Sequence, residues 1–305
     1  MNRALARAVA TVRTVLSCTL RCWFLLLCWS VPAWPAQALA AGVHAAGVHA
    51  VDATGVRIDL AQPARRVVTL APHLTEMMFA IGAGSRLIGV SDYSDYPPAA
   101  RRLPRVGDAF SANRESLLAL RPDLVLVWQS GGGSSAAQTL RRLGIAVFVS
   151  EPALLLDVPR EMEALGELLG LVTSAEAAAA SYRASLARAR PAPTTVPRRV
   201  FLQVGGPALY TVTDRQFLGQ ALTYCGARNV FGGLAGKAPV VSLEAVVAAR
   251  PQVVLQFDAD AATEPRQWQA LGLPRPVRVS AALLSRPGPR FAAGVAQLCR
   301  VLRSG

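Results

Sequence analysis

The sequence predicts an α/β protein of two lobes, each built on a parallel sheet, joined by a single long α-helix. Three observations support this prediction. Short β-branched runs alternate with helical patterns in both halves of the chain, one helix–strand phrase occurs twice, and an alanine-rich stretch separates the two copies. Such alternation is typical of βαβ units, whose strands are parallel. The 305 residues, 52% hydrophobic, suffice for two cores and exclude a chain that is disordered throughout.

The first forty residues have the pattern of a secretory signal. Four arginines precede an apolar run over residues 22–29, and Ala38-Leu-Ala40 supplies a small-x-small cleavage site. We therefore assign residues 1–40 to a cleaved signal peptide. An uncleaved membrane anchor is the alternative, because no charge occurs from Cys22 to Val51. Residues 41–64, which begin with a tandem Ala-Gly-Val-His-Ala, are expected to be a flexible N-terminal segment.

The cysteines agree with export. Three of the five lie within the first forty residues, which leaves Cys225 and Cys299 in the mature chain. An even pair in an exported protein indicates one disulfide, with two buried thiols as the alternative.

Strands and helices are then expected in the following order. In the N-terminal lobe, assigned to residues 65–155, they are strands at 67–70, 87–90, 124–128 and 147–149 and helices at 75–81 and 134–143. In the C-terminal lobe, assigned to residues 194–305, they are strands at 200–204, 253–257 and near Val279 and helices at 217–224 and 290–302.

An internal repeat links the two lobes. The phrase Glu-Ser-Leu-Leu-Ala-Leu-Arg-Pro-Asp-Leu-Val-Leu over residues 115–126 matches Glu-Ala-Val-Val-Ala-Ala-Arg-Pro-Gln-Val-Val-Leu over 244–255 in character, position by position. Each copy predicts a short helix stopped by Arg-Pro and then a buried strand. Two copies far apart indicate two similar, Rossmann-like lobes, with chance recurrence as the alternative.

The region between the lobes, residues 156–193, is expected to be helical. A capping box over residues 173–176 opens the alanine-rich stretch at 175–190, which Pro191 and Pro193 end. A helix of that length spans about 25 Å at about 1.5 Å per residue, enough to connect two domains rigidly.

No catalytic, metal or nucleic-acid site is predicted. The net charge of +13 comes from scattered arginines, with Lys237 as the single lysine, and no basic run alternates with aromatic residues as a nucleic-acid groove would require. His73 is the one histidine beyond the N-terminal segment; it is either an axial metal ligand or a local hydrogen-bonding residue. The run Gly131-Gly-Gly133 is a weak phosphate-binding pattern, or simply a flexible turn. The protein is therefore not expected to be an enzyme or to hold a cofactor.

Aromatic side chains gather instead at the carboxyl ends of the predicted strands, where open α/β sheets bind ligands. They suit a large, partly apolar ligand, with an arginine for a polar group. The candidate ligand-binding residues are Tyr93, Phe110, Trp128, Tyr210 and Arg286, with Tyr96 close by.

The two glutamates that open the repeat allow two interpretations. Asn113 and Ser242 are plausible N-caps, which places Glu115 and Glu244 in a first helical turn, where the helix dipole favours a carboxylate. Alternatively, two equivalent carboxylates, one on each lobe, dock on arginines of a two-fold symmetric partner.

The sequence from about residue 65 to the C-terminus resembles the substrate-binding proteins of vitamin B12 ABC importers, within the helical-backbone (class III) group. The resemblance rests on Arg66-Val-Val-Thr-Leu-Ala-Pro, Thr75-Glu76, Gly89 to Pro98 with its Tyr-Ser-Asp-Tyr-Pro-Pro, Asn113 to Trp128, Arg199 to Gln203, Cys225-Gly226, Asn229 to Phe231, Val241-Ser242, Glu244 and Gln297 to Cys299. It implies a monomeric periplasmic protein that captures cobalamin or a related corrinoid between two lobes and delivers it to a transmembrane permease.

Further residue roles are implied by this resemblance. Glu115 and Glu244 fall on the family's permease-docking carboxylates, and Cys225 and Cys299 fall on its disulfide. Of the corrin-contacting positions, Tyr93 and Trp128 match, Tyr210 replaces another aromatic residue, and Arg286 falls on a polar contact. The chain departs from the pattern at Ala109, Val204 and Ala238, where the family presents larger aromatic rings, although Phe110 lies beside the first of them. This less aromatic pocket leaves haem or a ferric siderophore as the alternative ligand.

Overall fold

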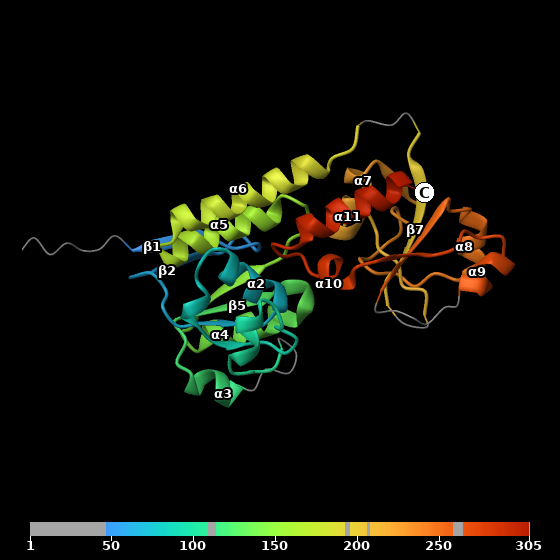
Figure 1. The fold of residues 1–305 in the computed structure, drawn as a ribbon. Coiled ribbons are helices and arrows are strands. Elements are labelled where there is room, and N and C mark those ends of the chain that lie inside the picture. Colours follow the sequence, from blue (N-terminus) through green and yellow to red (C-terminus); the bar gives the residue numbers. More distant parts are fainter. Residues whose placement is uncertain (1–46, 109–113, 193–195, 206–207, 259–264, 305) are drawn as a thin grey trace, which may run out of the picture. The chain divides into compact units, whose positions relative to one another are not determined.

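The computed structural model describes residues 47–108, 114–192, 196–205, 208–258 and 265–304 (Figure 1). Within them, two four-stranded sheets are entirely parallel, and a two-stranded antiparallel hairpin precedes both. The predictions for the signal peptide at 1–40, for Phe110, Ala109 and Asn113, and for Pro193 lie outside the described residues.

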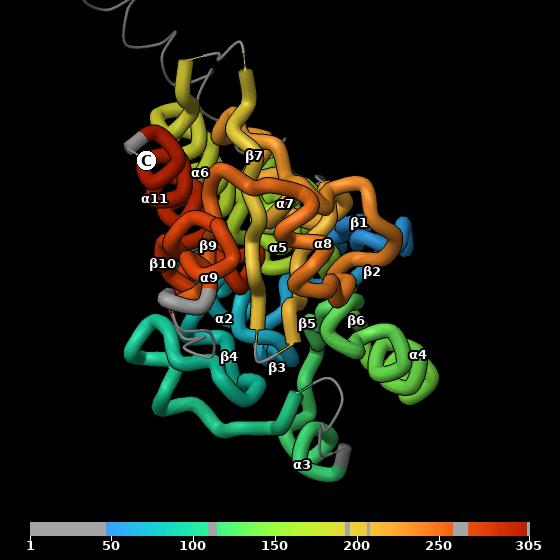
Figure 2. The backbone as a smooth tube through the Cα atoms, turned by 90° about the vertical axis from the view of Figure 1, so that its right-hand side faces the viewer, coloured from blue at the N-terminus to red at the C-terminus, as the bar shows by residue number. Residues whose placement is uncertain are grey.

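The N-terminal half contains the hairpin and the first parallel sheet. Its elements are β1 (Val48–Val51), β2 (Arg57–Leu60), β3 (Val67–Thr69), α2 (Pro72–Ala80), η1 (Gly84–Arg86), β4 (Leu87–Val90), η2 (Pro98–Arg102), α3 (Arg114–Ala119), β5 (Leu124–Trp128), η3 (Gln129–Gly133), α4 (Ser134–Arg142) and β6 (Ala146–Ser150). Every strand and helix expected here is present. In Figure 2 the green tube passes from α3 through β5 to α4, and α4 lies beside β6.

Two helices and then the second parallel sheet follow. The elements are α5 (Asp157–Leu169), α6 (Val172–Ala189), β7 (Arg198–Gln203), α7 (Phe217–Tyr224), β8 (Ala227–Asn229), α8 (Leu243–Ala249), β9 (Val253–Phe257), α9 (Pro265–Ala270), β10 (Val277–Val279), α10 (Ala281–Leu284) and α11 (Phe291–Ser304). The strand β8 was not expected, because its three residues, Ala-Arg-Asn, include no β-branched or aromatic side chain.

The two parallel sheets have the same topology. Their strand orders are β4-β3-β5-β6 and β8-β7-β9-β10, so in both the first strand lies between the second and the third. This confirms the predicted α/β fold of two similar lobes and explains the sequence repeat, because α3–β5 and α8–β9 are its two copies.

Each sheet is covered on both faces, since alternate residues of its strands enter different cores. In β7, Val200 and Leu202 pack with α7 and α11, whereas Phe201 packs with Trp268 and Val246 on the opposite face. The core that contains Val200 and Leu202 continues into residues of α5 and α6 and on to the first sheet. One apolar core therefore runs through both lobes along the connecting helices.

Helices α5 and α6 lie side by side (Figure 1), and α6 also packs against α11. The predicted end of α6 is confirmed, since Arg190 before Pro191 is extended. The predicted capping box is wrong. The helix begins at Val172, and the residue before it, Leu171, caps it without a side-chain hydrogen bond. Ser174 instead donates to the carbonyl oxygen of Ile81, 2.8 Å away, so it serves tertiary packing rather than capping.

The expectation of a flexible segment over residues 41–64 is wrong for residues 48–60, which form the β1–β2 hairpin. The buried side chain of Asp52 explains this order. Its Oδ1 accepts from the main-chain N–H groups of Thr54 and Val56 in the turn, at 2.9 and 3.1 Å. Its Oδ2 accepts from Arg141 at 2.7 Å, which ties the hairpin to α4. Sequence patterns did not show these long-range partners.

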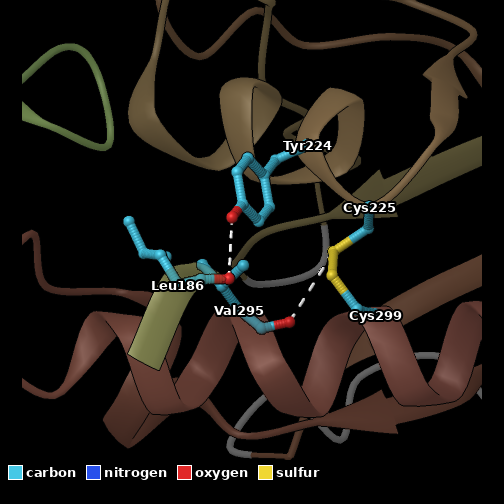
Figure 3. Close-up of a disulfide and its surroundings, with 5 residues drawn as sticks. All are labelled: Leu186, Tyr224, Cys225, Val295 and Cys299. Carbon is cyan, nitrogen blue, oxygen red and sulfur yellow. Dashed lines mark hydrogen bonds between the residues drawn. A yellow bond between two sulfur atoms is a disulfide. The ribbon is translucent and has the colours of Figure 1, made fainter. Parts of the chain in front are cut away.

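The predicted disulfide is present. Cys225 at the end of α7 and Cys299 within α11 are joined, and both are buried (Figure 3). On the same turn Tyr224 donates its hydroxyl to the carbonyl oxygen of Leu186, 2.7 Å away on α6. The end of α7 is therefore fastened to α11 by the disulfide and to α6 by a hydrogen bond.

Candidate functional site

A small cavity of about 30 Å³ lies at the carboxyl end of β5. It is lined by Trp128, Ser130, Glu151, Pro152, Ala153, Arg215, Gln216, Phe217 and Lys237. These residues come from both halves of the fold. One of them, Trp128, was predicted to bind the ligand. The side-chain oxygen of Gln216 is buried and has no hydrogen-bond partner among the described residues. The cavity thus combines an aromatic wall, charged groups and an unsatisfied acceptor.

Trp128 is held by the turn that follows it. A Cβ at Gly131 would lie 2.6 Å from the Trp128 ring, a Cβ at Gly133 would strike the Trp128 main chain, and Gly132 has a φ of 84°. Of the two interpretations of this glycine run, the structure favours the turn, because it lets the chain fold back over the indole. The Trp128 ring also meets His73 edge-on, with centroids 5.3 Å apart.

His73 lies in a buried chain of hydrogen bonds behind Trp128. Its Nε2 is 3.2 Å from the hydroxyl of Ser150, which donates to Glu161 Oε2 at 2.5 Å. Glu161 Oε1 accepts from the main-chain N–H of Glu151 at 2.9 Å. Burial, and then the charge of Arg286, lower the pKa of His73 to about 3, whereas burial raises the pKa of Glu161 to about 7. His73 is therefore a neutral hydrogen-bonding residue near neutral pH.

Lys237 closes the cavity from the other half of the fold. Its ammonium group donates to Glu151 and to the hydroxyl of Ser130. Glu151 also accepts from the main-chain N–H of Ser130 at 2.8 Å. We did not predict a role for Lys237, although its being the single lysine of the chain was a usable signal.

Arg286 lies in an ion cluster rather than at this cavity. Its Nη1 is 2.8 Å from Asp95 Oδ1 and 3.4 Å from Glu76 Oε1, and Glu76 is buried. Arg290 binds the same Glu76 with two nitrogens, at 2.6 and 2.9 Å, and its guanidinium lies 4.0 Å from the ring centroid of Tyr96. Burial acts to raise the pKa of Asp95, but the hydrogen bond and charge of Arg286 outweigh it and hold that pKa below its usual value.

The two predicted tyrosines are exposed. Tyr93 follows β4 with 78% of its surface accessible, and Tyr210 lies in the bridge to Val240 with 43% accessible. Neither lines the cavity at Trp128. Ala238, where a larger ring was expected, is exposed, and Val204 packs against the core.

Both repeat glutamates lie in the first turn of their helices, as predicted, and both are exposed. Ser242 caps α8 by accepting from the N–H of Ala245 at 3.2 Å. Glu244 accepts hydrogen bonds from its own backbone and then from Ser242, which lower its pKa. It is therefore ionised in the neutral range.

Within the described residues, histidines, cysteines and acids do not gather in groups of three or more that could hold a metal ion. A search of the same residues for a helix with the length and apolarity to cross a membrane finds none.

Comparison with known proteins places this geometry in a family. Residues 67–266 match the family described as "Periplasmic binding protein". The chain belongs to the periplasmic binding proteins. This family consists of solute-binding components of transport and not of enzymes, which agrees with the prediction that the protein has no catalytic role.

Individual relatives are similar over most of their length. A vitamin B12-binding protein of Pectobacterium atrosepticum is 33% identical over 246 residues, covering 78% of this chain and 88% of that protein. The crystal structure of the periplasmic vitamin B12 binding protein of Vibrio cholerae has a TM-score of 0.68 and 31% identity, covering 79% of this chain and 98% of that one. A periplasmic heme-binding protein in complex with two hemes has a TM-score of 0.67 and 27% identity, covering 78% of this chain and 98% of that one.

Proposed function

We propose that this periplasmic binding protein captures cobalamin, or a related corrinoid, between its two lobes and delivers it to an inner-membrane ABC transporter. The observation that carries the proposal is the 33% identity to vitamin B12-binding proteins over about nine-tenths of their length. On this proposal the corrinoid is the ligand and no resident cofactor takes part. The protein acts as a monomer, without nucleic acid, after cleavage of the signal at residues 1–40.

The ligand would occupy the carboxyl ends of the two sheets. Trp128 supplies a fixed aromatic wall, while the exposed rings of Tyr93 and Tyr210 offer apolar surface that a corrin would cover. Phe110 and Arg286 are proposed as the remaining contacts. The side-chain oxygen of Gln216, which has no partner in the described part of the chain, is a further candidate, because a ligand carboxamide would satisfy it by donating an N–H. The cavity of about 30 Å³ must widen first, since it has room for little more than a water molecule.

Delivery would use Glu115 and Glu244. They occupy equivalent exposed positions in the two copies of the repeat, which suits two equivalent basic sites on a two-fold symmetric permease. Carboxylates of this kind act mainly by steering and orienting the partner.

Haem is the second candidate, because a structure with bound hemes is 27% identical to this chain. Haem iron takes an axial ligand such as histidine or tyrosine. His73 is buried and bonded to Ser150, so among the proposed site residues the exposed Tyr93 is the better placed candidate.

Calorimetric titration of the mature protein, from Ala41, with cyanocobalamin tests the proposal. We expect one-to-one binding that is weakened at least about tenfold by Trp128→Ala, because buried aromatic contacts dominate such sites. Leu143→Ala, at an exposed apolar position on the end of α4, is the matched control and should bind like the wild type. Two results together would identify haem, rather than cobalamin, as the ligand. Cyanocobalamin would not bind, and haem addition would give a Soret shift that Tyr93→Phe abolishes.

A further inference from the structure

A second, larger cavity of about 640 Å³ lies away from the proposed corrinoid site. It is formed by the loop before α5, the start of α5, the second half of α6 and the end of α7, and it shares no residue with the cavity at Trp128. Its lining residues are Leu154, Leu155, Leu156, Arg160, Arg183, Leu186, Ala187, Arg190, Gln220, Thr223 and Tyr224. The volume falls within the range of small-molecule sites, about 300–1,000 Å³.

The apolar part of the cavity is incompletely covered. Leu154 and Leu156 each expose 48% of their surface, although they flank the buried Leu155. Leu186, from α6, is also buried at the cavity wall. Contiguous apolar surface in contact with water is unfavourable, and a ligand that covers it gains the corresponding free energy.

The charged side chains that line the cavity are all positively charged. Three arginines line it, and among the described residues no aspartate or glutamate does. Arg183 is bound by both oxygens of Glu163, at 2.6 and 2.8 Å, and Arg160 by Asp157 at 3.3 Å. Arg190 has no carboxylate partner among the described residues, and its guanidinium lies 5.7 Å from the ring centroid of Tyr224. An anion at this wall would therefore meet a charge that is not already neutralised.

Tyr224 is held in place beside Arg190. Its hydroxyl points to the carbonyl oxygen of Leu186 (Figure 3), and the next residue, Cys225, is locked in the disulfide. The ring is thus a fixed apolar surface, and Arg190 is positioned over it. Little side-chain freedom is lost when a ligand binds to such a wall, because the ring is already ordered.

We propose that this cavity binds a monomeric amphipathic carboxylate, of the fatty-acid class, with its chain over Leu154 and Leu156 and its carboxylate against Arg190. The proposal does not depend on cobalamin being the ligand of the other site. Since α5, α6 and α7 all contribute to the cavity, the bound carboxylate would bridge the connecting helices to the C-terminal lobe.

The test is calorimetric titration of the mature protein with sodium decanoate, kept below its micellar concentration, and with decan-1-ol as the uncharged equivalent. We expect one-to-one binding of decanoate, weakened about tenfold by Arg190→Gln, because a charge-assisted hydrogen bond is lost. The Leu154→Gln/Leu156→Gln variant should weaken both decanoate and decan-1-ol. Arg188→Gln, on the same helix, and Leu143→Gln, at an exposed leucine elsewhere, do not line the cavity and should bind decanoate like the wild type.

Three results would overturn the proposal. The first is no binding of decanoate to the wild type, or binding that neither cavity variant changes. The second is sedimentation with vesicles of anionic phospholipid without binding of monomeric decanoate, which would assign the cavity to a membrane surface. The third is concentration-dependent dimerisation that Leu154→Gln/Leu156→Gln abolishes, which would assign it to a second copy of the chain. An unchanged melting curve establishes that each variant is folded.

Discussion

Arg66 and Arg199 make the same hydrogen bond in the two lobes. Each donates from Nε to the carbonyl oxygen of an arginine that follows a short helix, Arg66 to Arg121 and Arg199 to Arg250, both at 3.1 Å. The two acceptor arginines also share a φ of 46° before a proline. The repeat is therefore reproduced in backbone detail, which gives the helices that carry Glu115 and Glu244 equivalent anchors.

Because of this equivalence, the Glu115→Ala/Glu244→Ala variant should bind cobalamin like the wild type but support much slower uptake. Both side chains are exposed, so their removal leaves the fold and the ligand cleft intact. The loss of two carboxylates at a docking surface removes charge complementarity to the partner. Uptake of labelled cyanocobalamin by cells that depend on the variant measures this. Glu176→Ala/Glu167→Ala, at exposed glutamates outside the repeat, is the control, and unchanged uptake in the docking variant would show that these residues do not dock.

The fold was predictable because its signals are local and repeated. The buried β-branched runs predicted the bounds of β4, β5 and β9 that the structure shows. The two Arg-Pro pairs predicted where the repeat helices end. The β1–β2 hairpin was missed because its order depends on Asp52 binding Arg141, 89 residues away. Local pattern carries no information about such a partner.

The candidate site was only partly predictable. Trp128 could be placed because it ends a buried strand, where α/β folds bind ligands. Arg286 was assigned to the ligand on the same logic, and this stays a prediction. Its pairing with Glu76 and Asp95 could not be predicted, because these partners lie 210 and 191 positions away in the sequence. Lys237 lies in a loop with no periodic pattern, so the sequence did not indicate that its charge reaches Glu151.

Lys237→Met is expected to raise the affinity for cobalamin by up to about fivefold. The ion pair joins Lys237 and Glu151, which both line the cavity at Trp128, and on the proposed function it would have to separate before a corrinoid enters. A half-exposed pair contributes up to about 1 kcal/mol, which sets the size of the effect. Calorimetric titration measures it, with Lys237→Arg as the control that retains the pair. Weaker binding in Lys237→Met would mean that the lysine contacts the ligand instead.

Glu161→Gln should change how stability depends on pH. Burial raises the pKa of Glu161 to about 7 from 4.5, so the folded protein binds its proton more tightly than the unfolded chain does. The associated stability is present below about pH 4.5 and is lost as pH rises through about 7, an effect on the order of 3 kcal/mol. Glutamine stays neutral, so the variant should gain stability relative to the wild type between pH 5 and pH 8.

The readout for Glu161 is the difference between variant and wild type in urea unfolding at pH 5, 6.5 and 8. His73 acts in the opposite direction, because burial lowers its pKa and stability is lost as pH falls below about 6.5. The difference between the two proteins isolates Glu161 from this background. Glu163→Gln, on the same helix but paired with Arg183, has a lowered pKa and should show no such gain. A constant difference across the three pH values would contradict the assignment.

Replacing the disulfide in Cys225→Ala/Cys299→Ala should lower the free energy of unfolding by about 3–4 kcal/mol. The bond closes a loop between residues 74 positions apart, and such a cross-link restricts the unfolded chain. It joins α7 to α11 away from the cavity at Trp128, so cobalamin affinity should stay within about twofold of the wild type. Urea unfolding measures the loss, and wild type unfolded in a strong reductant should reproduce the variant's midpoint. A loss below about 1 kcal/mol would mean that packing of the buried residues around Cys225 and Cys299, rather than the cross-link, holds α7 on α11.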